Sequence, residues 1–403
     1  MLVILISLFL ISILILKFPQ FTFIVAFTSQ FAWLPFQVAF RSSDLGPWVI
    51  ALQSVCILIL VLTKTSEIAK NHKFEILIFV MLGLLSILFK NKDVNWLTYF
   101  LGIKFIIVPA VISFAYLYGK DFQKKLISSI FILQILNFAA GVFERQFGLS
   151  RLLSFGFEYG TNIRNFDSGT LRVPGLAITN FDLGLTSGVI LSLAYFIQTG
   201  RLNFEQKYNQ FFILIVLISS AGGIFLSYSR SGAILSATVI LLGEAFERRG
   251  FLKAQTLFLT GAVVGLILMS GNFLFSDNSS FKARLSLWED LPKLTNPLIG
   301  QGVGTTGSAT KSSFTSAEIP VVVDNYIISI YLQLGLLAII IFGAYLSYLV
   351  VKGDSFGRAL VVGLIVAMQF VELWEYSLPT SLLLFLYYSF SRHDSSEFLK
   401  TRI

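Results

Sequence analysis

The stretch Leu226-Ser-Tyr-Ser-Arg-Ser-Gly-Ala233 joins two apolar runs, 211–227 and 231–246. As helices, runs of this length approach the thickness of a bilayer core. Arg230 therefore lies in a very short turn between two predicted membrane spans, where a guanidinium is costly unless it is paired or faces water. Two interpretations stay open: an interfacial arginine whose head reaches water, or an anion-binding residue at the extracytoplasmic surface.

The composition around this stretch is that of a polytopic helical membrane protein. Of 403 residues, 55% are hydrophobic and 13% are charged, and the repeated apolar runs of about 20 residues are not those of a soluble domain. The single cysteine, Cys56, excludes an internal disulfide, a thiolate metal cage and an iron–sulfur site. With only two histidines, His72 and His393, a histidine-rich metal site is excluded as well.

The predicted fold class is an all-α polytopic membrane protein with about 12–13 transmembrane helices in a single integral membrane domain, 1–403. The run 21–40 is the weakest candidate, because Gln30 and Pro35 interrupt it. Residues 1–16 lack a basic region and a small-residue cleavage site, so they predict a first short span and not a cleavable signal peptide. The candidate spans are 2–16, 21–40, 46–63, 74–89, 94–118, 125–143, 178–198, 211–227, 231–247, 252–275, 324–351, 357–374 and 376–391.

Basic residues predict the orientation. Lysine and arginine recur in alternate loops and in the tail after 391, and by the positive-inside rule these segments are cytoplasmic. The loops are 64–73, 119–125, 200–210, 247–253 and 352–358. The opposite side then carries two long extracytoplasmic loops, 144–177 and 276–323, which are longer than simple connections require.

The first long loop is rich in arginine and contains no lysine, whereas the cytoplasmic loops favour lysine. Its arginines are Arg145, Arg151, Arg164 and Arg172. A need for positive charge alone would not select arginine, but binding of phosphate or carboxylate through paired donors would. Chance combined with surface solubility is the alternative explanation.

The end of the first loop predicts a turn followed by a helix start. Pro174 and Gly175 mark the turn, and Asn180 and Asp182 fall in the first turns of the next span. An acid at that position is favoured by the helix dipole, so Asp182 has a structural explanation beside a functional one.

The second long loop contains two recognisable segments. Residues 281–291 predict a short amphipathic helix, with Phe281 and Trp288 on one face, that rests on the membrane surface. Further on, Gly300, Gly302 and Gly304 resemble a phosphate loop. No strand precedes them and no Gly-Lys-Ser/Thr follows, so close backbone packing is the alternative.

The loop closes with Asp324-Asn325-Tyr326, where the next span begins. Asp324 fits the N-cap position before Tyr326. A carboxylate at the mouth of a membrane site also suits a general base. Both interpretations of Asp324 stay open.

Together these segments resemble the O-antigen ligase and polymerase superfamily of membrane glycosyltransferases, in particular the Wzy-type polysaccharide polymerases. The segment 226–233 is similar to the family's Ser-Arg-Gly segment. Arg284, Trp288 and 296–304 are similar to its Arg…Trp…Pro-Leu-Phe-Gly-x-Gly-x-Gly segment. Residues 324–326, followed by Gly-Leu at 335–336, are similar to its His-Asn or Asp-Asn segment.

Two arginine spacings strengthen the resemblance. Wzy-type polymerases carry Arg, ten residues, Gly in one outer loop, and Arg164 to Gly175 has this spacing. They carry Arg, fifteen residues, Gly in the other, and Arg284 to Gly300 has that spacing. The resemblance covers about 140–345.

The resemblance implies a GT-C-like fold in the bacterial inner membrane, with the active site facing the periplasm or cell exterior. It implies transfer of a growing glycan from undecaprenyl diphosphate to a second lipid-linked oligosaccharide repeat unit, as in lipopolysaccharide O-antigen synthesis. The expected partners are this lipid-linked donor and acceptor, membrane lipid and a chain-length regulator. No cofactor, metal or nucleic acid is expected.

The chemistry assigns roles to residues. Arg230 and Arg284 are predicted to stabilise the leaving diphosphate, and Asp324 is predicted to deprotonate the acceptor hydroxyl. Glu318 and Asp167 are the next candidates for the base, and Glu372 and Glu375 are more remote ones. The predicted substrate-binding residues are Arg164, Arg172, Gly175, Trp288, Gly300, Asn325 and Tyr326.

Two other functions stay open. Ligases of the superfamily, which transfer glycan to lipid A core, have a histidine at the position of Asp324, whereas both histidines here are predicted to be cytoplasmic. A transporter or flippase for lipid-linked sugars would place ionisable groups at the midplane, and only Lys104, followed by Pro109, and Glu244 stand out within spans.

Overall fold

The computed structural model of this chain is all-α apart from one short hairpin in its described part. Contacts group the chain into two compact units, residues 1–68 with 111–232 and residues 69–110 with 233–403, and each unit is described by itself. The described residues are 17–29, 34, 61, 63–89, 94, 96–160, 162–165, 170–202, 208–247, 296–306, 323, 325–371, 373–375 and 377–390.

Several helices have the length and apolarity of membrane spans. In the described part of the chain four helices qualify, and a fifth does if the pair α5 (Thr65–Asn71) and α6 (Lys73–Leu88), bent by 103°, counts as one span. The four are α8 (Lys120–Ser154), α9 (Asn180–Gln198), α10 (Gln210–Ser227) and α15 (Tyr326–Lys352). They indicate a multi-pass membrane protein. The predicted spans 2–16 and 252–275 lie outside the described residues, so the total of 12–13 stays a prediction.

Predicted spans and observed helices differ in several places. Within the run 21–40, the described residues are 21–29, which lie in α2 (Pro19–Ser29), and the helical Leu34. The run 94–118 is divided into α7 (Trp96–Ser113), which contains Pro109, and the 3-10 helix η1 (Phe114–Tyr118). The predicted span 125–143 is shorter than the helix observed there, α8, which continues through a break at Gly148 to Ser154. Residues 144–147 and 149–154 of the predicted loop 144–177 are therefore helical.

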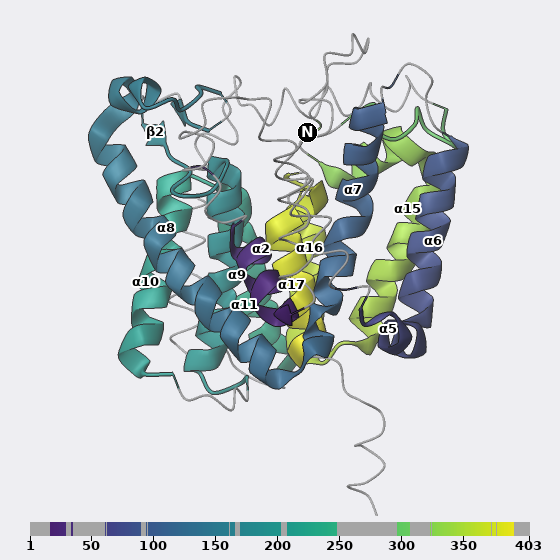
Figure 1. Ribbon diagram of the computed structural model, residues 1–403, viewed down its shortest axis with the longest axis horizontal. Coiled ribbons are helices and arrows are strands. Elements are labelled where there is room, and N and C mark those ends of the chain that lie inside the picture. The colour runs from purple at the N-terminus through teal and green to yellow at the C-terminus, as the bar shows by residue number, and fades with distance from the viewer. Residues whose placement is uncertain are drawn as a thin grey trace, which may run out of the picture. The chain divides into compact units, whose positions relative to one another are not determined.

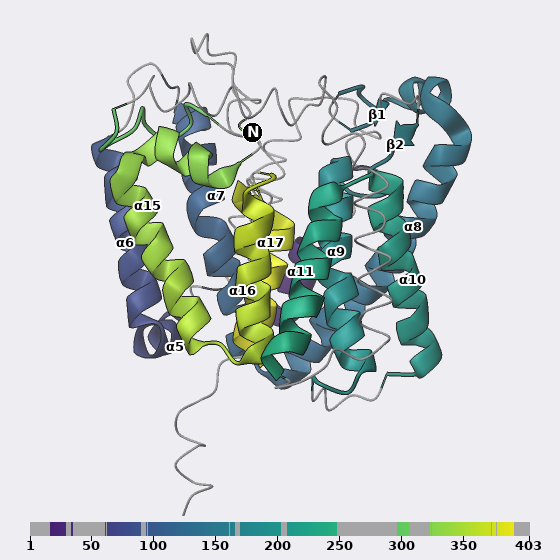
Figure 2. The ribbon, with the colours of Figure 1, turned by 180° about the vertical axis from the view of Figure 1, so that it is seen from behind.

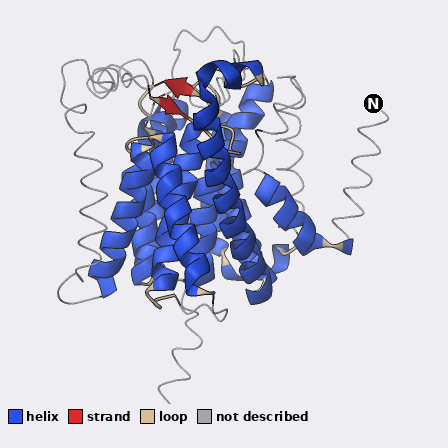
Figure 3. Ribbon diagram, turned by 90° about the vertical axis from the view of Figure 1, so that its left-hand side faces the viewer, coloured by secondary structure: helices blue, strands red, loops and turns tan. Residues whose placement is uncertain are grey.

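The first unit is a bundle built on α8, α9 and α10, with α2 packed against α8 (Figure 1). The hairpin of β1 (Arg164–Asn165) and β2 (Leu171–Arg172) lies at the end of this bundle where α8 stops and α9 starts (Figure 3). The start of α8, whose first turns carry lysines, lies at the opposite end (Figure 1). The arginine-rich and lysine-rich segments of this unit are therefore at opposite ends of its helices.

Small residues bring α9 close to the turn between α10 and α11 (Arg230–Glu247). Gly184 and Gly188 lie one turn apart on α9, and a Cβ on Gly188 would contact the backbone oxygen of Gly232. A Cβ on Gly232 would in turn contact the backbone oxygen of Gly184. Such close approach between helix backbones is typical of small-residue packing in membranes. The three glycines therefore fix the position of the turn that carries Arg230.

We expect Gly232→Ala to lower the stability of the protein by about 1–3 kcal/mol, because the added methyl group has no room. Gly343→Ala is the matched control, since a Cβ at this α15 glycine meets nothing within 4 Å and alanine favours a helix by up to about 1 kcal/mol. Thermal unfolding in detergent micelles measures both. A Gly232→Ala protein that melts at or above the wild-type temperature would contradict the close packing.

The second unit packs α6 against α15, α15 against α16 (Ser355–Met368), and α16 against α17 (Ser377–Phe390) (Figure 2). Its core is aromatic around Trp374, which lies in the 3-10 helix η4 (Leu373–Glu375) and is fully buried. The Trp374 indole N–H donates to the backbone oxygen of Ile106 at 3.1 Å, and its ring lies edge-on to Phe342 at 4.8 Å. This bond joins α7 to η4.

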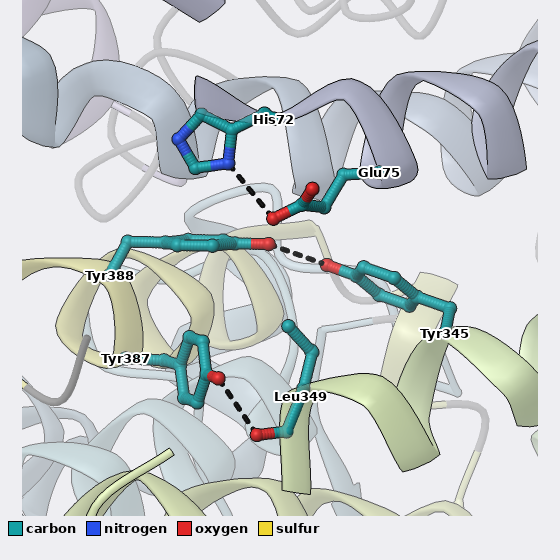
Figure 4. Close-up of polar contacts among 6 residues, drawn as sticks. All are labelled: His72, Glu75, Tyr345, Leu349, Tyr387 and Tyr388. Atoms are coloured by element: carbon teal, nitrogen blue, oxygen red, sulfur yellow. Dashed lines mark hydrogen bonds and ion pairs between the residues drawn. The ribbon is translucent and has the colours of Figure 1, made fainter. Parts of the chain in front are cut away.

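The second unit holds a buried polar cluster (Figure 4). Nδ1 of His72 lies 2.9 Å from Oε1 of Glu75, and both side chains are almost fully buried, at 0% and 1% exposed. The His72 ring lies edge-on to Tyr388 at 5.2 Å, and the hydroxyls of Tyr388 and Tyr345 are 3.4 Å apart. The cluster therefore joins the start of α6 to α15 and α17. The sequence placed His72 in a cytoplasmic loop and gave no sign of this burial.

Candidate functional site

The turn that carries Arg230 is as short as the sequence predicted. Helix α10 ends at Ser227 and α11 begins at Arg230, so only Tyr228 and Ser229 lie between them. The Ser227 hydroxyl accepts from the backbone N–H of Ser229 at 3.2 Å, and the Ser229 hydroxyl accepts from that of Gly232 at 3.2 Å. These two side chains cap the turn from within, and half-buried Arg230 is the first residue of the new helix.

Two predicted arginines face each other across the hairpin. Strands β1 and β2 are antiparallel, and their register pairs Arg164 with Arg172. Directly opposite residues project from the same face of such a pair, with Cβ atoms roughly 5 Å apart. Like charges at such positions repel each other. A shared anion would relieve this repulsion.

The hairpin is bonded directly to the end of α10. The backbone N–H of Val173, the residue after Arg172, donates to the backbone oxygen of Leu226 at 3.4 Å. Beneath the hairpin, buried apolar residues join it to α8 and α10: Leu152, Ile163, Leu171, Val173 and Leu226. Arg164, Arg172 and Arg230 therefore share one end of the first unit, although 58 positions separate Arg172 from Arg230 in the chain.

Gly175 has a defined structural role at this site. Its φ of +63° is left-handed, and a Cβ would lie 2.5 Å from the backbone oxygen of Asn137. Its N–H donates to Oε2 of the buried Glu144 at 2.8 Å, and the next N–H, of Leu176, donates to Oδ1 of Asn137 at 2.6 Å. Two side chains of α8 thus hold the segment after β2. A contact of Gly175 with substrate stays a prediction.

Glu144 and Asn137 were not among the residues predicted for the site. Glu144 is 7% exposed and Asn137 is fully buried, and such polar groups are retained inside a membrane protein only when they are bonded or functional. The signal available in the sequence was an acidic residue directly before Arg145 at the end of an apolar run. The predicted boundary at 144 placed that residue in a solvated loop.

Asp182 has the structural role expected of an acidic residue in the first turn of a helix. It lies in the first turn of α9, and its backbone N–H donates to the hydroxyl of the N-cap residue Thr179 at 3.1 Å. The Thr179 hydroxyl donates to the Asp182 carboxylate at 2.8 Å. These reciprocal bonds stabilise the start of the helix.

The glycine-rich loop uses its backbone N–H groups inside the protein. Gln301 and Gly302 donate to the backbone oxygens of Leu332 and Gln333 at 2.7 and 2.8 Å, and Gly304 donates to Oε1 of Gln333 at 3.1 Å. A phosphate loop requires such groups to point at the anion. The structure therefore favours the packing interpretation of these glycines over the phosphate loop.

The loop packs into a break in α15. Gly335 is non-helical, with φ 73° and ψ −168°, and the bonds to Leu332 and Gln333 satisfy oxygens on the N-terminal side of the break. Gly300 has φ +69°, and a Cβ there would lie 2.6 Å from the backbone of Gln333. Only a glycine fits this contact. A role for Gly300 in binding substrate stays a prediction.

The start of α15 corrects one expectation. The N-cap is Asn325 and not Asp324, because the Asn325 side chain accepts from the backbone N–H groups of Ile327 and Ile328 at 2.9 and 3.2 Å. Tyr326 is 1% exposed and lies against Phe342 and Trp374. Tyr326 is thus a core residue in this structure, and the predicted substrate contacts of Asn325 and Tyr326 stay predictions.

Several predicted site residues lie outside the described part of the chain. They are Arg284, Trp288, Asp324, Asp167, Glu318 and Glu372, and the amphipathic helix 281–291 lies outside it as well. Within the described ranges, no three or more histidine, cysteine or acidic side chains gather as metal ligands. That the reaction needs no metal ion therefore stays a prediction.

Comparisons with known proteins give no further guidance. No protein-family model, curated protein or solved structure matches the chain. The case for a function therefore depends on the residues and their geometry.

Proposed function

We propose that this chain is a Wzy-type polysaccharide polymerase, a glycosyltransferase of the bacterial inner membrane with 12 or 13 spans and an outward-facing site. It transfers a growing glycan from undecaprenyl diphosphate to a lipid-linked repeat unit. The observation that carries the proposal is the pairing of Arg164 with Arg172 in a hairpin whose following residue, Val173, is bonded to the end of α10, next to the turn before Arg230. Three arginines at one end of apolar helices suit a lipid that carries a diphosphate.

The proposed reaction assigns each group a task. The acceptor hydroxyl oxygen attacks the anomeric carbon of the donor sugar, and the bond from that carbon to the diphosphate oxygen breaks. The hydroxyl proton passes to a base, for which Asp324 is the first candidate. Negative charge develops on the leaving diphosphate, and Arg230 and Arg284 stabilise it while Arg164 and Arg172 hold the diphosphate.

The N-terminus of α11 supports the role of Arg230. Because α11 begins at Arg230, the positive end of its helix dipole and a cationic side chain belong to the same helix end. Both favour an anion near the start of α11. A half-buried position also strengthens such electrostatic contacts relative to open water.

Transfer by the purified chain in nanodiscs, given one defined lipid-linked repeat unit, tests the proposal. We expect products that grow by whole repeat units, with and without EDTA, and no consumption of a lipid A core acceptor. Transfer only to lipid A core would establish the ligase alternative. Movement of the intact lipid-linked sugar across vesicles without transfer would establish the flippase, and either result would overturn the proposal.

A further inference from the structure

Tyr228 has an unusual backbone conformation next to the candidate site. With φ 48° and ψ 35° it is the one non-glycine residue with positive φ in the described part of the chain. A bulky side chain in this left-handed region is unfavourable and persists only when surrounding contacts hold it. The residue stands two positions before Arg230, so whatever holds Tyr228 also fixes the start of α11.

Arg145 of α8 makes these contacts. Its Nη2 donates to the Tyr228 hydroxyl at 3.2 Å, and its guanidinium lies 5.5 Å from the centre of the Tyr228 ring. The same guanidinium lies 5.2 Å from the ring of Phe225, whose own ring is 5.5 Å from that of Tyr228. One planar cation thus bridges the last turn of α10 and the left-handed residue after it.

We infer that Arg145 is a positioning residue, which holds Tyr228 in its left-handed conformation and thereby fixes Arg230 for the lipid diphosphate. The second part of this inference rests on the proposed function. Arg145 acts here through Tyr228, so its loss loosens the turn without removing a charge from the diphosphate. A planar guanidinium is suited to this task because it stacks and donates at the same time.

Backbone hydrogen exchange of residues 226–232 tests the first part independently of activity. In Arg145→Ala we expect exchange of this segment to rise roughly tenfold, because a cation–π contact and a hydrogen bond are lost together. Tyr228→Phe keeps the ring and loses only the hydroxyl, so its exchange should rise less. Arg151→Ala is the matched control, an exposed arginine on the same helix beyond Gly148, and should leave exchange unchanged.

Transfer kinetics test the second part. Arg145→Ala should lower kcat roughly tenfold with little change in KM, since a group that acts in the transition state is misplaced. The double variant Arg145→Ala with Tyr228→Gly should recover part of the lost kcat, because glycine adopts positive φ without the contacts of Arg145. If Arg145 contacts the substrate directly, Tyr228→Gly should restore no kcat. Failure of this rescue would therefore overturn the positioning role of Arg145.

The outcomes separate this inference from the proposed function. Unchanged exchange in Arg145→Ala would overturn the inference whatever the activity. Faster exchange with unchanged kcat would also overturn the positioning of Arg230. If Arg145→Ala exchanges faster but the wild-type protein transfers no glycan, the result supports the contact of Arg145 with Tyr228 and rejects the polymerase function.

Discussion

An Arg230→Lys protein is expected to transfer glycan at least about a hundredfold more slowly than wild type, although its charge is unchanged. Removing one preoriented donor from a site where charge develops costs about 10²–10³ in rate. Lysine offers a compact point charge, whereas arginine presents a planar fork that matches two phosphate oxygens.

Rates of repeat-unit transfer by purified Arg230→Lys and Arg151→Lys proteins measure this effect. Arg151 is exposed and lies on the same predicted outer segment, so its replacement should leave the rate within about twofold. A near-normal rate in Arg230→Lys would count against recognition through paired donors. It would favour the alternative in which Arg230 is an interfacial arginine.

The second large effect is expected at the buried pair of His72 and Glu75. Glu75→Ala should lower the free energy of unfolding by about 1–3 kcal/mol, because it leaves the buried Nδ1 of His72 without its hydrogen-bond partner. The pair is 0% and 1% exposed and connects the start of α6 to Tyr388 and Tyr345 of the polar cluster. A polar group buried this deeply is costly when it loses its hydrogen-bond partner.

The chain provides a matched control one helix earlier. Lys64 and Glu67 form a pair with the same three-residue separation, 2.7 Å apart, but 28% and 47% exposed. Glu67→Ala should change stability by less than about 1 kcal/mol, as is usual for surface pairs. Equal effects of the two substitutions on thermal or denaturant unfolding would show that burial of His72 and Glu75 contributes nothing.

The sequence was informative where the signal is local. Apolar runs predicted the helices now seen as α9, α10 and α11, because periodicity and length are properties of a contiguous segment. The short turn before Arg230 was predicted for the same reason. The first turn of α9 was also placed correctly, since Pro174 and Gly175 mark the turn before it.

The sequence was less informative where distant segments determine the outcome. Helix α8 continues to Ser154 and α15 breaks at Gly335 because of contacts with a hairpin and a loop that lie elsewhere in the chain. Strands of two residues carry no alternation to detect, so the pairing of Arg164 with Arg172 was not predicted. The N-cap at Asn325 differs from the expected Asp324 by one position, and both residue types cap helices well.

The proposed activity requires the arginine hairpin to face the side of the membrane where flipped lipid-linked sugars are found. Labelling with a membrane-impermeant maleimide tests this most directly, in a background where the single cysteine, Cys56, is replaced by serine. Ser150→Cys on α8 and Ser66→Cys on α5 are both exposed helical positions, one at each predicted side. We expect Ser150→Cys to be labelled in intact spheroplasts and Ser66→Cys only after the membrane is opened, and the reverse pattern would contradict the proposed outward-facing site.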